Sequence, residues 1–247
     1  MKFLSFDIEI SDVFDLKPDE DMLKYAPFHV AVAAAVDCEG KRTLWFSTDA
    51  SGAPEVNMER TLARELLLDL EARQREGWML FAWNGLGFDL RWLGHHAGDV
   101  ELAARIAVAH YDPMFQFYNQ RGFTISLATV GQTMEVPQKK LMNAAEAPRH
   151  WRDGRHQLVQ DYVTGDCEIL NQIVDRIARE GAIRWTTRQG KLSREPFLRF
   201  KTVAEVLRDP LPDQSWMRGG GLPREHFTSW LPPSVLRPAS KSGHYGS

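Results

Sequence analysis

The chain has 247 residues, of which 43% are hydrophobic and 26% are charged, so it is long enough to bury a sizeable core in one domain, or in one domain with an appendage. Its formal net charge of −3 excludes a uniformly basic nucleic-acid coat, and its two cysteines exclude a disulfide framework and a cysteine-rich metal cluster. The longest apolar stretch, residues 26–36, is shorter than the ~20 residues of a membrane span, and the N-terminus shows no secretory leader, so we expect a cytoplasmic protein without membrane contact.

Two hydrophobic periods alternate along the chain. Short apolar runs bounded by turn residues predict strands, and apolar residues three and four positions apart predict helices. In chain order, these patterns predict a strand over 2–9, an acidic loop over 11–21, strands over 28–37 and 42–47, a helix over 57–77, a strand over 78–84, a helix over 87–98, a strand over 105–112, and helices over 113–122 and 125–134.

The second half of the chain begins with a long helix predicted over 155–181, followed by a hairpin over 182–197 and a helix over 201–208. Beyond residue 210 the chain is rich in Pro, Gly and Ser, which predicts irregular structure, and we expect 232–247 to be a disordered tail. Strands followed by helices in this order predict an α/β fold with a mixed sheet.

The first predicted strand ends with two carboxylates two positions apart, Asp7 and Glu9. Side chains at positions i and i+2 of a strand point to the same face, so both negative charges are directed at one place. Taken alone, the pair could equally be an edge feature or could cap a neighbouring helix. Further acidic residues at the same place would be needed to indicate a site.

Such residues follow later in the chain. Asp89 begins a helix after a buried strand, and Gly85 and Gly87 just before it would allow close approach by a ligand backbone. Tyr162 and Asp166 are four positions apart on the long helix, so they share a face.

Each of these residues also has an ordinary structural explanation. Asp89 could simply favour the positive end of the helix dipole, and Tyr162 could be a packing residue with a hydrated hydroxyl. Asp112 is also acidic and ends a predicted strand, but a cap for the helix that begins at Pro113 explains it best.

Taken together, the acidic positions indicate a metal site. Four carboxylates in one cleft would repel one another unless cations neutralised them. Carboxylate oxygens are hard ligands that suit Mg²⁺ or Mn²⁺, and no Cys/His cluster with zinc spacing competes in the sequence. The sequence therefore predicts a site for divalent cations formed by Asp7, Glu9, Asp89 and Asp166.

The order of these motifs resembles a known family. Phe-Asp-Ile-Glu at 6–9, Asn-x-x-x-Phe-Asp at 84–89 and Tyr-x-x-x-Asp at 162–166 are similar to the three exonuclease motifs of the DEDD superfamily, in its tyrosine-containing branch. Within that branch the chain resembles stand-alone exonucleases that are similar to the proofreading domain of family B DNA polymerases. Segments 110–117, 144–155 and 211–217 also resemble this group, so the resemblance covers about residues 1–231. One departure is Ile10, where many relatives have a threonine.

The resemblance implies a ribonuclease H-like mixed sheet flanked by helices, in a single exonuclease domain over 1–231 on which the basic hairpin, helix and C-terminal extension of 182–231 are packed. It also implies hydrolysis of the 3′ end of single-stranded DNA by a two-metal mechanism, with release of nucleoside 5′-monophosphates. By the same resemblance, Asp7 bridges the two ions, Glu9 and Asp166 complete the first, and Asp89 holds the second. Tyr162 is expected to orient the attacking water.

Contacts with the terminal nucleotide are expected beside the second motif. The resemblance places Asn84 and the turn at Gly85 next to that nucleotide. Phe88 could stack on a base, as aromatic residues do in sequence-tolerant single-strand binding, although most aromatic residues of this kind belong to cores.

A basic segment could hold the rest of the strand. Residues 184–208 contain seven Lys or Arg residues against two Glu residues. Arg188, Lys191 and Arg194 at the predicted hairpin could grip phosphates, and a solvated hairpin face explains them equally well.

Several functions share these motifs. A 3′ exoribonuclease of the same fold stays open, because the contacts that recognise a 2′-hydroxyl group are not readable from the sequence. A nucleic-acid-binding module without catalysis is disfavoured, because all four acids and the tyrosine are present. A proofreading subunit that works with a separate polymerase also stays open, as does another partner from DNA replication or repair.

Overall fold

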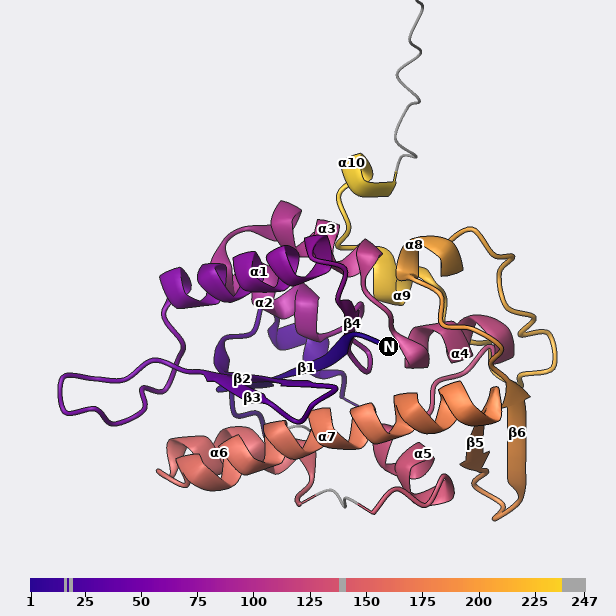
Figure 1. Cartoon of the computed structure of the whole chain (residues 1–247), viewed down its shortest axis with the longest axis horizontal. Coiled ribbons are helices and arrows are strands. Elements are labelled where there is room, and N and C mark those ends of the chain that lie inside the picture. Colours follow the sequence, from indigo (N-terminus) through magenta and orange to yellow (C-terminus); the bar gives the residue numbers. More distant parts are fainter. Residues whose placement is uncertain (16, 18–19, 138–140, 237–247) are drawn as a thin grey trace, which may run out of the picture.

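The computed structural model describes residues 1–15, 17, 20–137 and 141–236. Its centre is a four-stranded sheet with the order β3-β2-β1-β4 (Figure 1). The strands are β1 (Phe3–Ile10), β2 (Val30–Asp37), β3 (Arg42–Trp45) and β4 (Met79–Phe81). β1 pairs with β2 and β2 with β3 in antiparallel fashion, whereas β1 and β4 are parallel. The predicted mixed α/β fold is thus confirmed, and it is consistent with a ribonuclease H-like arrangement.

Helices cover both faces of this sheet (Figure 1). On one face lie α1 (Arg60–Arg75), α2 (Asp89–Ala97) and α3 (Val100–Ala109), while α7 (His156–Glu180) crosses the other. The other helices of the described residues are α4 (Pro113–Arg121), α5 (Leu127–Thr133), α6 (Ala147–Arg152), α8 (Val203–Val206), α9 (Glu225–Thr228), α10 (Pro233–Leu236) and the short 3₁₀ turns η1 (Met22–Tyr25) and η2 (Ala144–Glu146). Within the described residues, none of the helices combines the length and the apolar character needed to cross a bilayer.

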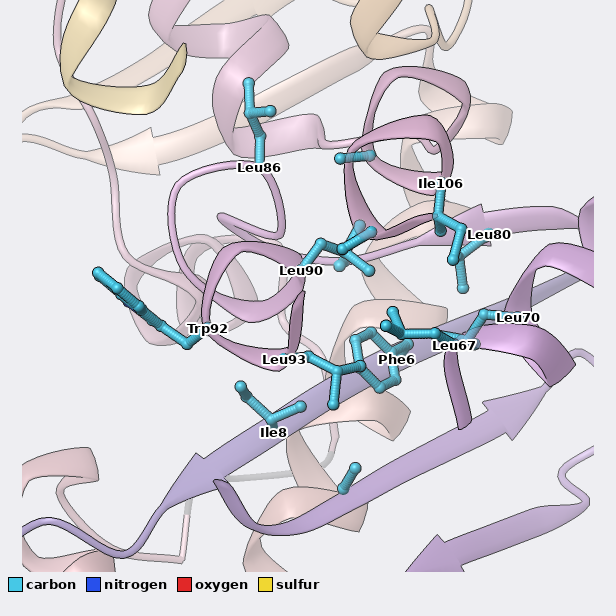
Figure 2. Close-up of a cluster of buried hydrophobic side chains, with 14 of the residues drawn as sticks. Phe6, Ile8, Leu67, Leu70, Leu80, Leu86, Leu90, Trp92, Leu93 and Ile106 are labelled. Atoms are coloured by element: carbon cyan, nitrogen blue, oxygen red, sulfur yellow. The ribbon is translucent and has the colours of Figure 1, made fainter. Parts of the chain in front are cut away.

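The side chains of β1 divide between the two faces of the sheet. Phe6 and Ile8 are buried in one apolar cluster with Leu90 and Leu93 of α2, and Figure 2 shows these four side chains converging there. Because successive strand residues alternate, the odd-numbered positions of β1 point to the opposite face, which α7 covers. This alternation is what directs the acidic residues of β1 toward α7.

The strand predicted over 105–112 is wrong for most of its length. Up to residue 109 this segment belongs to α3, which Asp99 caps through its side chain and whose buried apolar residues recur at helical spacing. The run Arg-Ile-Ala-Val-Ala suits either a strand or a helix, and the cap upstream favours the helix. Only Tyr111 keeps a strand-like role, because it forms a parallel bridge with Phe81 at the edge of the sheet.

The described C-terminal residues match the predicted elements only in part. The predicted hairpin forms as β5 (Ala182–Thr186) and β6 (Leu192–Pro196), whereas the helix predicted over 201–208 shrinks to the single turn of α8. The predicted tail 232–247 is corrected at its start by α10, where proline occupies the first helical position and Ser234 donates a hydrogen bond to the Glu101 carboxylate of α3 at 3.1 Å. Residues 237–247 of that predicted tail lie outside the described residues.

Candidate active site

A cavity of about 730 Å³ lies at the C-terminal end of β1. Its lining contains the five residues that the sequence proposes for catalysis, which come from β1, the start of α2 and α7: Asp7, Glu9, Asp89, Tyr162 and Asp166. Asn84 and Phe88 line the same cavity. Three sequence motifs that are far apart along the chain therefore meet at one place.

Asp7 and Glu9 reach the cavity from the strand. They pair with Ala34 and Val32 of β2, and the register of the two strands shifts directly after Glu9, between Glu9 and Ile10. Glu9 is buried and Asp7 is half-buried, which leaves Asp7 the more accessible of the two carboxylates.

Asp89 is the first residue of α2, and its carboxylate is almost fully buried. Its Oδ1 accepts a hydrogen bond from the backbone N–H of Ile8 at 3.1 Å. β4 pairs with β1 only over Phe3–Ser5, so Asp89 supplies an acceptor to β1 beyond the end of its neighbouring strand. Burial raises the pKa of Asp89 to about 7, and the hydrogen bonds from Ile8 and with Asp7 limit that rise.

The turn that leads into α2 is held by Asp112. This buried carboxylate accepts the backbone N–H groups of Asn84 and Leu86, both at 3.1 Å, and the N–H of Phe115 at 3.0 Å. It therefore caps α4, as expected, and also fixes the turn, in which Asn84 has a left-handed backbone with φ 69°. Burial raises the pKa of Asp112 to about 6.

The glycines of this turn are explained by packing inside the protein. A Cβ atom at Gly85 would lie 2.4 Å from Cβ of Ala82 and 2.7 Å from Nε2 of His110. Gly85 is buried and is not among the described residues that line the cavity, and its contact with a nucleotide stays a prediction. A Cβ atom at Gly87 would lie 2.5 Å from Oδ1 of Asn84. Neither glycine needs a ligand to explain it.

Tyr162 and Asp166 face the strand from α7. The Tyr162 ring is buried against the β2 side of the sheet, and one turn further on the Sγ of Cys167 donates a hydrogen bond to the carbonyl of Ala34 at 3.5 Å. Burial holds the pKa of Tyr162 far above its ordinary value, and the negative charges of Asp166, Glu9 and Asp7 raise it further. The hydroxyl therefore sits among three carboxylates.

The remainder of the cavity is largely apolar, and part of it comes from two segments without any recognisable motif. Phe14 belongs to the loop after β1, and Leu222, His226 and Phe227 belong to the C-terminal extension. Phe14, Leu222 and Phe227, together with the half-buried Phe88, give the cavity apolar lining beside its acidic residues. Sequence reasoning missed Phe14 and the three residues of the extension, since no local pattern marks them.

The basic hairpin lies apart from this lining. Within the described residues, the cavity lining includes none of Arg188, Lys191 and Arg194, although all three side chains are exposed. Three of the seven basic residues counted in this segment form ion pairs: Arg184 with Glu180, Arg199 with Glu205 and Lys201 with Asp209. The positive charge available to a ligand is therefore smaller than the sequence count, and it is concentrated at the hairpin.

The donor chemistry of the cavity fits a hard divalent cation. The four carboxylates proposed from the sequence all belong to the lining, and three of them are buried: Glu9, Asp89 and Asp166. Burial already disfavours the charge of Asp89, and a cation would favour it. In the described part of the chain, no three His, Cys, Asp or Glu side chains are already grouped as a metal cluster, so cation binding belongs to the proposal below.

Comparisons with known proteins identify only a distant likeness. No family model matches the chain, and no curated protein matches it. Among solved structures, the chain is similar to the family B DNA polymerase from the hyperthermophilic archaeon Pyrobaculum calidifontis, with 15% sequence identity and a TM-score of 0.48. The match covers 73% of this chain and 24% of the polymerase chain, so the chain spans about a quarter of the length of that protein.

Proposed function

We propose that the protein is a metal-dependent 3′–5′ exonuclease that hydrolyses phosphodiester bonds at the 3′ end of single-stranded DNA and releases nucleoside 5′-monophosphates. The observation that carries this proposal is the convergence of Asp7, Glu9, Asp89, Tyr162 and Asp166 on one cavity. Each of these residues could have an ordinary structural role by itself, such as capping a helix or packing. Those separate roles do not explain why all five side chains line the same cavity.

The four carboxylates would hold two divalent cations, Mg²⁺ or Mn²⁺. When bound, such ions supply Lewis-acid stabilisation of the attacking and leaving oxygens of a phosphodiester. Asp7 suits the shared position, because it is the most accessible of the four carboxylates and is hydrogen-bonded to Asp89. Glu9 and Asp166 would complete one ion and Asp89 the other.

Tyr162 would orient the attacking water. Burial raises the pKa of Tyr162, and even the ordinary tyrosine value of ~10 leaves the hydroxyl protonated at neutral pH, so it is a poor base and can donate or accept a hydrogen bond. A water held by a fixed hydroxyl loses less entropy on reaching the transition state, which is a positioning effect.

The volume of the cavity suits the end of a single strand better than a duplex. Its volume of about 730 Å³ falls within the range of about 300–1,000 Å³ that holds small ligands, so it suits a terminal nucleotide better than a duplex. The acidic side would face the phosphate through cations, and Phe88 and the other apolar residues would face the base.

Digestion of labelled oligonucleotides tests the proposal. With Mg²⁺ or Mn²⁺, 5′-labelled single-stranded DNA should shorten stepwise from its 3′ end, and EDTA should stop the reaction. A 3′-phosphate should block digestion, and circular single strands should survive. Rapid cutting of the circle would show an endonuclease instead, and full activity in EDTA would exclude the metal site. The same assay on RNA of equal sequence decides between DNA and RNA as the substrate.

A further inference from the structure

The C-terminal extension forms part of the wall of the cavity. Leu222, His226 and Phe227 line it together with the acidic residues of β1 and α7. Phe227 is buried, with its ring centroid 4.7 Å from that of Tyr118 and 5.4 Å from that of Phe115 in α4. The extension is therefore packed into the fold at the point where it meets the cavity.

Hydrogen bonds hold this wall in place on both sides of α9. The hydroxyl of Tyr118 donates to the carbonyl of Leu222 at 2.6 Å, and the indole N–H of Trp230 donates to the carbonyl of Leu86 at 2.8 Å. The guanidinium of Arg224 donates to three backbone carbonyls of the loop after α8, at 3.0–3.3 Å. Leu86 belongs to the turn before Asp89, so the wall and the second motif are connected directly.

The charges of the lining side chains distinguish His226 from the rest of this wall. Five carboxylates line the cavity, because Asp12 joins the four acidic residues already described. Among the lining residues in the described part of the chain, His226 is the only one whose side chain can carry a positive charge. Its imidazole is exposed, so it can reach a ligand from α9.

We infer that His226 is a substrate-binding residue whose imidazole donates a hydrogen bond to a phosphate next to the scissile one. This inference rests on the proposed function. A strand that enters the cavity brings more than one phosphate, and cations on the carboxylates compensate only the phosphate that reacts. The neighbouring phosphate meets no Lys or Arg in the described lining, so the His226 imidazole is the group available to it. His226 would thereby help to hold the strand in position.

Two substrates separate this role from a structural one. The first is a single-stranded oligonucleotide, and the second is the p-nitrophenyl ester of thymidine 5′-monophosphate, which has a reactive phosphodiester but no neighbouring phosphate. His226→Ala should raise KM for the oligonucleotide about tenfold, the loss expected for one hydrogen bond to a charged group, with kcat little changed. The kcat/KM for the ester should stay within about twofold of that of the unmodified protein, since the missing contact is absent from that substrate.

Two further variants complete the experiment. His226→Gln keeps a hydrogen-bond donor and should raise KM for the oligonucleotide less than His226→Ala does. Glu225→Ala changes the preceding residue of α9, which is exposed and is not among the described lining residues, so it controls for damage to the helix. An unchanged KM for the oligonucleotide in His226→Ala, or an equal loss on both substrates, would overturn the inference. If the unmodified protein cleaves neither substrate, the proposed function fails instead.

Discussion

Asp112 holds the turn before Asp89, and Asp112→Ala tests how much that turn depends on one side chain. The carboxylate accepts three backbone N–H groups, those of Asn84, Leu86 and Phe115, and the residue is only 2% exposed. In the variant, all three donors lose their partner at a place that water reaches poorly. The turn would then hold Asn84 and Asp89 less firmly at the cavity.

Two opposing terms set the size of the effect. Three orphaned donors at about 1.5 kcal/mol each would cost about 4.5 kcal/mol. Against this, the alanine variant avoids burying a charge: the pKa of Asp112 is raised to about 6, so the ionised carboxylate lowers the stability of the unmodified protein by about 3 kcal/mol at pH 8 and by about 1.5 kcal/mol at pH 5. Because the folded-state pKa is raised, the unmodified protein is most stable while Asp112 is protonated, below about pH 4. It loses that stability as the pH rises through about 6 and the buried carboxylate ionises.

We therefore expect Asp112→Ala to lower the free energy of unfolding by about 3 kcal/mol at pH 5 and by about 1.5 kcal/mol at pH 8. Urea unfolding of both proteins at the two pH values measures the difference. Asp99→Ala is the matched control: Asp99 caps α3 by accepting one backbone N–H, that of Leu102 at 3.2 Å, and its other carboxylate oxygen pairs with the exposed Arg64 at 3.1 Å. A cap contributes about 1 kcal/mol and an exposed ion pair less, so its loss should cost only about 1–1.5 kcal/mol. The reasoning is refuted if Asp112→Ala is no more destabilising than Asp99→Ala at pH 5, or if its effect grows with pH.

Three further predictions concern the proposed chemistry. Asp7→Ala should abolish nearly all activity and weaken Mn²⁺ binding in calorimetry, while the fold stays intact or gains stability because carboxylate crowding is relieved; unchanged affinity and rate would place the site on the wrong residues. Tyr162→Phe keeps the buried ring and should bind Mn²⁺ and DNA normally while cleaving about 100-fold more slowly in single turnover, whereas a normal rate would leave Tyr162 as a packing residue. A triple variant with Ala in place of Arg188, Lys191 and Arg194 should bind single-stranded DNA more weakly, and its affinity should depend less on salt concentration. An unchanged dependence of affinity on salt would make the hairpin an ordinary solvated surface.

Features that depend on nearest neighbours along the chain were predictable. The two-residue spacing of Asp7 and Glu9, out of phase with Phe6 and Ile8, already indicated that the acids and the apolar residues face opposite sides of one strand. The long amphipathic helix was predicted over 155–181 and extends over His156–Glu180, because its period and its final glycine are local signals.

The sequence alone could not decide the local structure where the same residues fit two different conformations or contacts. The apolar run after residue 105 fits either a strand or a helix, and packing against α1 and α2 together with the cap at Asp99 decides for the helix. Gly85 is another case, because its lack of a side chain suits a ligand or a neighbour equally well. The structure shows the neighbours, Ala82 and His110.

The sequence by itself determined which residues we propose for the chemistry, since the acids and Tyr162 stand in short motifs whose geometry is local. Only the tertiary structure decided what surrounds them. Leu222, His226 and Phe227 reach the cavity because distant contacts, such as that of Trp230 with Leu86, return the end of the chain to the second motif. Such a contact depends on the whole path of the backbone, so no periodicity or spacing within a short segment reveals it.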